Sequence, residues 1–400
     1  MKASEYMELE LAYGAHNYEP LPVVISKAKG VWVWDVDGKK YLDMLSCYSA
    51  MSQGHIHPYI INAAKKQLEK LTLTSRAFFN DRLGIFLKHL CKLASMEMAL
   101  PMNTGAEAVE TAIKLARKYA YKKRGLPNGK AEIIVCENNF HGRTTTIVGF
   151  SSDKLTYDCY GPFTPGFIKI PYNDINAFKK AITNNTIGLL IEPIQAEAGV
   201  IVPDEGYLKK LRDICTEHNI LLMLDEIQTG LGRTGKLFAF EHEGIRPDIL
   251  ILGKALGGGI VPISAVLSSK EIMSVFTPGT HGSTFGGNPL ACAIGDAALD
   301  VIVNEKLAER AREIGEYFMK KLRTIKSKKI KEIRGKGLLI GVEMHVKKNE
   351  NVRPLCEKLL RAGVLAKDTH EKTIRLAPPL IITKDEIDWA FGRIRKVLEG

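Results

Sequence analysis

From about residue 57 the chain alternates between short apolar runs and helical stretches, and this alternation is the strongest constraint on its fold. The strand-like runs are Glu132–Cys136, Ile187–Glu192, Ile220–Asp225 and Asp248–Leu252. The helical stretches follow Pro58 and cover Asp81–Ala94, Ala106–Lys122 and Tyr207–His218. Strands that alternate with helices form a mostly parallel sheet covered by helices on both faces. The sequence therefore predicts an α/β fold with the sheet in a large central domain.

The two ends of the 400-residue chain have a different pattern. Near the start, VVISKAKG and VWVWDVDGKKYLDML form a strand pair around a tight turn at Asp37-Gly38. After about residue 290 a long helix, the strand GLLIGVEM, a helix, two short strands and a closing helix indicate a smaller α+β domain. We therefore predict an N-terminal segment 1–45 that packs with the small domain, a large domain 46–290 and a small domain 291–400.

Composition and charge exclude several classes of protein. No apolar run approaches the ~20 residues that cross a bilayer, and MKASEYMELELAYG lacks the apolar core of a signal peptide. The seven cysteines are odd in number and contain no CxxC pair, which argues against a disulfide framework, a zinc ribbon or another metal site. We expect no metal, no membrane and a reducing, cytoplasmic location.

The net charge of +11 raises the possibility of a nucleic-acid-binding protein. The basic residues are dispersed, however, and the densest stretch, Lys320–Lys331, has few aromatic residues. Such a run is typical of a solvated helix face followed by a loop. An excess of positive charge also suits an enzyme whose ligands are phosphates and carboxylates, so we expect no nucleic-acid partner.

Two ionisable residues end neighbouring apolar runs. Ile220–Leu224 is followed by Asp225, and Asp248–Leu252 by Gly253 and Lys254. Ligands of an open parallel sheet bind beyond the carboxyl ends of its strands. Each residue alone could be a solvated strand end, but burying both costs several kcal/mol per ion unless they pair or serve a cofactor. A desolvated lysine can form a Schiff base, and an acid can hold a pyridinium nitrogen protonated, which points to pyridoxal phosphate.

A helix start offers a place for the phosphate of that cofactor. Gly105 and Ala106 open the helix after Asn103-Thr104, and the free N–H groups of a first helical turn bind anions. The same residues also fit an ordinary capping box of Thr104 with Glu107. The two interpretations are compatible, because a helix start has four N–H groups without intrahelical partners.

A glycine-rich stretch resembles two nucleotide-binding motifs. Gly230–Gly235 matches GxGxxG, and GLGRTGKL is close to a P-loop. The stretch KLFAFEHEG is a poor helix start, however, and Leu237 stands where a P-loop needs Ser or Thr. We interpret the stretch as a flexible loop beside the site.

The motifs together resemble a known family. LLMLDEIQTGLGRTGKLFAFEHEGIRPDILILGKALGGG is similar to the signature of the class III (omega) aminotransferases. NTGAEAVETAIKLAR, NNFHGRT, IEPIQAEAGV, HGSTFGGNPLA and IRLAPPL extend the resemblance over nearly the whole chain. The resemblance implies a pyridoxal-phosphate-dependent transferase of fold type I, with a mostly parallel seven-stranded sheet in the large domain. Within the family, YGAHNYEPLP, LTSRAFFND and YGPFTPGF resemble the branch that uses ornithine.

The resemblance assigns cofactor roles to single positions. Lys254 matches the Schiff-base lysine, and Asp225 the partner of the pyridinium nitrogen. The remaining cofactor positions are Gly105 and Ala106 for the phosphate, Phe140 stacked on the ring, Gln228 at the ring hydroxyl, and Ser283 with Thr284 for the phosphate across a dimer interface. The last match implies a homodimer with shared active sites.

The substrate positions of the family fall on Tyr18, Tyr48, Arg143, Glu197 and Arg375. An arginine such as Arg143 can hold a carboxylate bidentately. Glu197 is expected to pair with Arg375 while ornithine is bound and to release it for the second carboxylate of 2-oxoglutarate. Without the resemblance, ordinary surface ion pairing would explain these charges as well.

The expected reaction is transfer of the δ-amino group of L-ornithine to 2-oxoglutarate, giving glutamate 5-semialdehyde, which cyclises to pyrroline-5-carboxylate, and glutamate. His141, Gly257 and Ala196 depart from the ornithine branch, and His141 is common in the acetylornithine branch. The alternatives are therefore an acetylornithine or other omega-aminotransferase, an aminomutase, which would need no external keto acid, and a non-enzymatic basic protein, which would lack a borohydride-reducible Schiff base.

Overall fold

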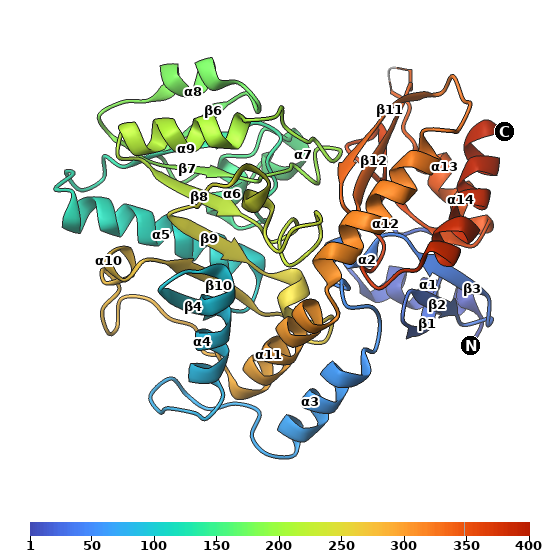
Figure 1. Cartoon of the computed structure of the whole chain (residues 1–400), viewed down its shortest axis with the longest axis horizontal. Coiled ribbons are helices and arrows are strands. Elements are labelled where there is room, and N and C mark those ends of the chain that lie inside the picture. Colours follow the sequence, from blue (N-terminus) through green and yellow to red (C-terminus); the bar gives the residue numbers. More distant parts are fainter. Residues whose placement is uncertain (348) are drawn as a thin grey trace.

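The computed structural model describes residues 1–347 and 349–400. Within them, a seven-stranded sheet forms the centre of the larger lobe in Figure 1. In spatial order its strands are β4 (Met98–Met102), β10 (Ser264–Ser268), β9 (Ile249–Leu252), β8 (Leu221–Asp225), β7 (Thr186–Ile191), β5 (Glu132–Cys136) and β6 (Phe167–Ile170). Only β10 runs antiparallel to its neighbours. The expected mostly parallel seven-stranded sheet is therefore confirmed.

Apolar side chains on both faces of this sheet are buried under helices. Strands β7, β8 and β9 are buried along their whole length, as expected for strands covered on both sides. The helical elements of this lobe are α2 (Ser46–Ser49), α3 (Pro58–Leu68), α4 (Leu83–Ala94), α5 (Gly105–Lys123), α6 (Thr145–Gly149), α7 (Lys154–Tyr157), α8 (Ile175–Ala181), α9 (Tyr207–Glu217), η1 (Ala239–Glu243), η2 (Lys254–Gly257), α10 (Lys270–Met273) and α11 (Pro289–Asn304).

The second lobe combines both ends of the chain (Figure 1). Its N-terminal part contains α1 (Ala3–Tyr13), β1 (Ile25–Lys29), β2 (Trp32–Asp35) and β3 (Lys40–Asp43). Its C-terminal part contains α12 (Leu307–Leu322), β11 (Ile330–Lys336), β12 (Leu339–Met344), α13 (Arg353–Arg361), β13 (Val364–Leu365), β14 (Lys367–Thr369), β15 (Thr373–Leu376) and α14 (Lys384–Glu399). Strand β13 pairs in parallel with β3, so the two ends share one sheet. The division at residues 45 and 290 remains a prediction.

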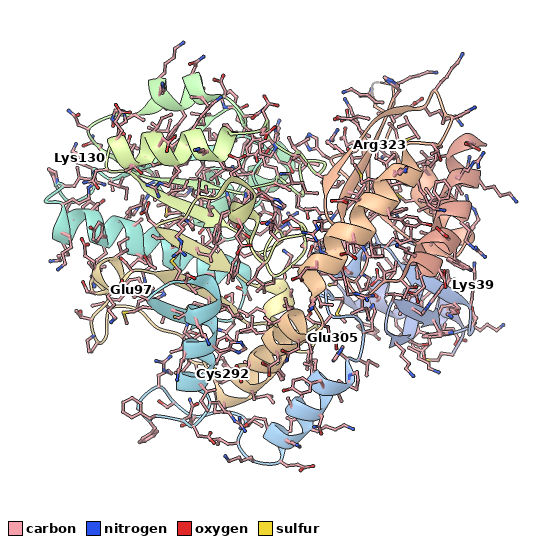
Figure 2. All side chains as sticks on the ribbon, viewed as in Figure 1. Lys39, Glu97, Lys130, Cys292, Glu305 and Arg323 are labelled. Atoms are coloured by element: carbon pink, nitrogen blue, oxygen red, sulfur yellow. The ribbon has the colours of Figure 1, made fainter. Side chains whose placement is uncertain are left out.

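The single long helix expected after residue 290 is two helices. Helix α11 ends at Asn304, and α12 begins at Leu307 after Lys306, whose φ of 52° is left-handed. Glu305 marks this break in Figure 2. Helix α11 packs on α3 and α4, whereas α12 packs on α14 and β11. The break thus lets one stretch of chain pass from the larger lobe to the smaller one.

The seven cysteines are free thiols, and four of them are buried. In the described part of the chain, no helix is long and apolar enough to cross a membrane.

Candidate active site

A cavity of about 460 Å³ lies at the carboxyl ends of the central strands. The end of β8 contributes Asp225, the second residue after β9 is Lys254, and the start of α5 contributes Gly105 and Ala106. Phe140 and Gln228 complete the predicted cofactor residues that line it. The sheet therefore brings together six predicted positions that are up to 149 residues apart (254 − 105).

Asp225 is buried, and both of its carboxylate oxygens have partners. Oδ2 lies 2.7 Å from Nδ1 of His141, and Oδ1 accepts a hydrogen bond from the backbone N–H of Ile227 at 3.1 Å. Burial lowers the pKa of His141, but the hydrogen bond and charge of Asp225 outweigh it and leave that pKa above its ordinary value. Nε2 of His141 is buried without a partner in the described residues. The pair fixes an acidic oxygen at the wall of the cavity.

Lys254 follows β9 in a left-handed conformation with φ of 47°. Such a conformation is unusual for a residue with a side chain and is often found at functional sites. Burial lowers the pKa of Lys254 below its ordinary value, and the charges of Glu197 and Asp225 oppose this shift. A larger fraction of the amine is therefore neutral, the form that acts as a nucleophile or base.

The start of α5 forms a cradle for an anion. The N–H groups of Asn103 and Thr104 donate to the Glu107 carboxylate at 3.1 and 2.8 Å, and the Glu107 N–H donates to Thr104 Oγ1. The predicted capping box is therefore present. It leaves the first-turn N–H groups of Gly105 and Ala106 for a ligand in the cavity. A Cβ on Gly105 would lie 3.0 Å from Cδ1 of Ile227, so glycine keeps this cradle open.

Phe140 forms another wall and is tied to a buried carboxyl group. Its backbone N–H donates to Oε1 of Glu192 at 2.9 Å. Glu192 follows β7 and lines the same cavity. Burial raises the pKa of Glu192 to about 7, against the opposing influence of His141.

Three polar side chains close into a triangle beside the cavity. Arg375 Nη1 donates to Glu197 Oε1 at 2.7 Å, and Arg375 Nη2 donates to Gln228 Oε1 at 2.8 Å. Gln228 Nε2 in turn donates to Glu197 Oε1 at 3.2 Å. The guanidinium of Arg375 also lies 5.4 Å from the ring centroid of Tyr48. Four predicted residues thus meet at one end of the site.

The remaining four predicted residues also lie outside the described lining of the cavity, as do Tyr48, Glu197 and Arg375. Tyr18 is 76% exposed, and Thr284 is also exposed. Arg143 is exposed with its guanidinium 5.8 Å from the ring centroid of Phe140. Ser283 Oγ accepts a hydrogen bond from Asn103 Nδ2 at 2.9 Å. One chain alone therefore does not bring Tyr18 or Thr284 into the cavity.

Glu192 and His141 belong to the site, and sequence patterns predict no role for either. Glu192 directly follows a buried strand, so the rule that predicts Asp225 applies to it as well. His141 differs from the ornithine branch, which by itself indicates no contact. Its contact with Asp225 joins positions 84 residues apart, and no local pattern indicates that pairing.

The cavity fits pyridoxal 5'-phosphate in the chemistry of its donors and acceptors. The cradle at Gly105 and Ala106 suits a phosphate, the Asp225 carboxylate suits a protonated ring nitrogen, and the Phe140 ring suits an aromatic face. The Lys254 amine lies in the same cavity, where it can react with an aldehyde.

Comparison with known proteins agrees with this geometry. Residues 13–398 match the class III aminotransferase family. The chain is 58% identical to an ornithine aminotransferase of Brevibacillus brevis, with 99% of this chain and 98% of that protein aligned. An ornithine aminotransferase structure from Toxoplasma gondii, described with partial PLP occupancy, has a TM-score of 0.97 at 46% identity and covers 99% of this chain and 94% of its own.

An acetylornithine aminotransferase structure from Elizabethkingia anophelis is also similar, with a TM-score of 0.91 at 48% identity over 100% of this chain and 99% of its own. Because the family match and the full-length relatives coincide with a cavity built for the cofactor, the chain belongs to the class III aminotransferases, a family of pyridoxal-phosphate enzymes.

Proposed function

We propose that this enzyme transfers the δ-amino group of L-ornithine to 2-oxoglutarate, giving glutamate 5-semialdehyde, which cyclises to pyrroline-5-carboxylate, and glutamate. The observation that carries the proposal is the contact of Glu197 with Arg375 beside the cavity. A carboxylate that covers an arginine allows one site to accept a diamino acid and a dicarboxylate in turn. Full-length similarity to an ornithine aminotransferase supports this substrate.

Pyridoxal phosphate would be held by the residues that line the cavity. Gly105 and Ala106 would bind its phosphate, Phe140 would stack on its ring, and Asp225 and Gln228 would bind the ring nitrogen and hydroxyl. When bound, the cofactor supplies the carbon that carries the amino group between substrates and a ring that accepts electron density.

Lys254 would move the proton of the reaction. Its amine would hold the cofactor, and the free amine would take the proton from the δ-carbon of ornithine as a general base. The lowered pKa of Lys254 favours the neutral amine that this step needs. The 2.7 Å contact with Nδ1 of His141 would orient the Asp225 carboxylate toward the ring nitrogen.

The charged residues near the cavity would bind the two substrates. Arg143 would hold a carboxylate through its planar guanidinium. While ornithine is bound, Glu197 neutralises Arg375. When 2-oxoglutarate enters, Glu197 moves aside and Arg375 binds one of its carboxylates. Tyr48, next to Arg375, and Tyr18 would form the end of the pocket that receives the α-amino group of ornithine.

We further propose a homodimer with shared sites. Exposed Thr284, with Ser283, would bind the phosphate in the partner subunit. Phe78, Phe79 and Phe285 are exposed apolar side chains of the kind that a subunit interface covers. The seven free thiols support a reducing compartment, and we infer a cytoplasmic enzyme.

A panel of amino donors tests this function. The purified enzyme is given ornithine, N-acetylornithine or 4-aminobutyrate with 2-oxoglutarate, and glutamate and pyrroline-5-carboxylate are measured. We expect ornithine to have the highest kcat/KM, and Tyr18→Phe and Tyr18→Ile to narrow its advantage, because a site built for a polar group rejects analogues that leave it unpaired. A higher kcat/KM for N-acetylornithine would establish the alternative that His141 and Gly257 favour. Turnover of a single amino acid without 2-oxoglutarate would indicate an aminomutase.

A further inference from the structure

The segment that carries Tyr48 has a strained backbone. Ser46, Cys47, Tyr48 and Ser49 have φ angles of 45°, 47°, 57° and 78°, so four consecutive residues with side chains lie in the left-handed region. This conformation costs roughly 1–2 kcal/mol per residue for ordinary amino acids. It persists only where the surrounding structure holds it. Helix α2 is therefore a left-handed turn that needs an external support.

Arg233 contacts both ends of this left-handed turn. Its Nη2 donates to Ser46 Oγ at 3.1 Å and to Ser52 Oγ at 3.0 Å. Ser52 Oγ donates in turn to the carbonyl oxygen of Ser49 at 3.0 Å. One guanidinium nitrogen thus reaches the first residue of the turn directly and the last residue through one hydroxyl.

The other terminal nitrogen of Arg233 donates to residues that lie next to strands of the smaller lobe. Its Nη1 donates to the carbonyl oxygens of Leu338 and Pro378 at 3.0 and 2.6 Å. Pro378 lies three residues beyond Arg375, just after β15. Ser46 Oγ also donates to the Ala377 carbonyl at 2.6 Å. The same side chain therefore connects the turn of Tyr48 to the strand of Arg375.

Packing alone does not explain why a charged side chain is buried at position 233. The side chain is fully buried, and the four partners of its terminal nitrogens are neutral oxygens. Burial lowers the pKa of Arg233 to about 9. Apolar side chains of similar volume often stabilise a protein as well as buried ions do. A planar fork of donors, in contrast, can orient four oxygens from three segments at once.

The glycine-rich loop that resembled a nucleotide motif places this arginine. Gly230–Gly235 is buried. It begins two residues after Gln228 of the site, and the Arg233 carbonyl accepts a hydrogen bond from the Leu338 N–H at 3.1 Å. A Cβ on Gly337 would lie 2.5 Å from the Thr234 carbonyl carbon, so the two chains touch backbone to backbone.

We propose that Arg233 is a positioning residue for the substrate end of the site: it holds the left-handed turn of Tyr48 against the strand of Arg375 and so sets donor selectivity without touching the cofactor. The proposal rests on the proposed function only for the identity of the preferred donor. In this role Arg233 sets the distance between Tyr48 and Arg375, so its loss should affect substrate binding more than cofactor binding.

The test compares Arg233→Lys with the unmodified holoenzyme and with Arg310→Lys. Arg310 also donates to part-buried carbonyls, those of Ile381 and Ile382, and among the described residues it makes no hydrogen bond to the turn. We expect Arg233→Lys to keep a stoichiometric cofactor, to change kcat little and to raise the KM for ornithine roughly tenfold or more, because a misplacement of ~1 Å can cost ~10²-fold. In Arg233→Lys the donor ratio, which is kcat/KM for ornithine divided by kcat/KM for N-acetylornithine, should fall. Arg310→Lys should leave the KM for ornithine and the donor ratio unchanged.

A double-mutant cycle identifies the route of the effect. If Arg233 acts through the turn, adding Arg233→Lys to Tyr48→Phe should change the donor ratio much less than it does alone. If Arg233→Lys does not fold, Ser46→Ala with Ser52→Ala removes the two hydrogen bonds that Arg233 Nη2 makes to hydroxyl groups and should narrow the donor ratio in the same way. The proposal would be overturned if Arg233→Lys left the KM for ornithine and the donor ratio unchanged, or if it lost only cofactor. It would also be overturned if the effects of Arg233→Lys and Tyr48→Phe on the donor ratio were fully additive. A preference of the unmodified enzyme for N-acetylornithine would overturn the proposed function but not this role, which a changed donor ratio would still support.

Discussion

Asp225 is the last residue of β8 and Lys254 lies two residues beyond β9, and the sequence predicts both because each follows a buried apolar run. The direction of the Asp225 carboxylate depends on His141, which is 3% exposed and lies on a loop after β5. Strand ends are visible in sequence, whereas packing sets the path of the loop that carries His141 from the end of β5 to the end of β8. The residues at strand ends could therefore be predicted, and their supporting contacts could not.

Replacing Lys254 tests the residue that the strand pattern identifies most directly. We expect Lys254→Ala to abolish steady-state transamination while the protein still folds, because anchor and base are lost together. Turnover, circular dichroism and borohydride-reducible absorbance measure the three parts of this expectation. Undiminished turnover of the purified variant would contradict it.

Because His141 orients Asp225, replacing each residue in turn measures the effect of the Asp225 charge separately from the effect of its orientation. Asp225→Ala should lose both catalysis and cofactor affinity, since removing a buried charge partner costs ~3–5 kcal/mol in typical cases. His141→Phe keeps the carboxylate but removes the 2.7 Å hydrogen bond, so cofactor affinity should fall by less than in Asp225→Ala. Titration of each apoenzyme with pyridoxal phosphate gives the two dissociation constants. Equal affinity of His141→Phe and the unmodified protein would mean that Asp225 needs no orienting partner.

At the scale of elements, sequence patterns predict regular structure and miss strained structure. Strands β5, β7, β8 and β9 lie within one residue of their predicted bounds because continuous apolar runs mark them. The left-handed turn at Ser46–Ser49 contains no glycine, and neither does the break at Lys306. The conformation of the turn at Ser46–Ser49 is held by contacts with distant residues such as Arg233, which local propensity does not contain.

Glu226 supports η1 and makes stability depend on pH. Its carboxyl oxygens accept hydrogen bonds from the backbone N–H groups of Ala239 and Phe240 at 2.7 and 2.8 Å. Burial raises the pKa of Glu226 to about 8. The folded protein therefore binds this proton more tightly than the unfolded chain, whose carboxyl pKa is ~4.3. The contribution of Glu226 to stability is complete below that value and is lost as pH rises through about 8.

We expect Glu226→Gln to be less stable by ~1–3 kcal/mol, since an amide offers one acceptor for two N–H groups. The difference from the unmodified protein should be largest near the acid end of the range and shrink as pH rises, because only the carboxyl group titrates. Urea unfolding at about pH 5, 7 and 9, with protein concentration held fixed, measures this difference. A difference that is constant with pH would show that Glu226 keeps one protonation state throughout.

At the scale of the molecule, surfaces without internal partners are where the proposed second subunit would lie. Helix α1 has no buried residue although it carries leucine, methionine and tyrosine side chains, and Phe79 is fully exposed. Thr284 is exposed as well and lies outside the cavity lining of its own chain. A partner that covers these residues would add Thr284 to the phosphate cradle at Gly105, so each site would need two chains.

Hybrid dimers test whether the site is shared. Lys254→Ala and Thr284→Arg should each be inactive as homodimers. In a hybrid of the two, the Thr284→Arg subunit keeps its own Lys254 and receives an intact Thr284 from its partner, so one of the two sites is restored. Random assortment of equal amounts should then recover about a quarter of the unmodified activity, since half of the dimers are hybrids. Co-expression of the two variants under different tags, followed by tandem purification, isolates the hybrid.

The control pair is Lys254→Ala with Asp225→Ala. Each of these residues lines the cavity of its own chain, so both sites of the hybrid stay defective and no activity should be recovered. If Thr284 serves its own chain, the first pair will recover nothing either, because each site of the hybrid will retain one defect.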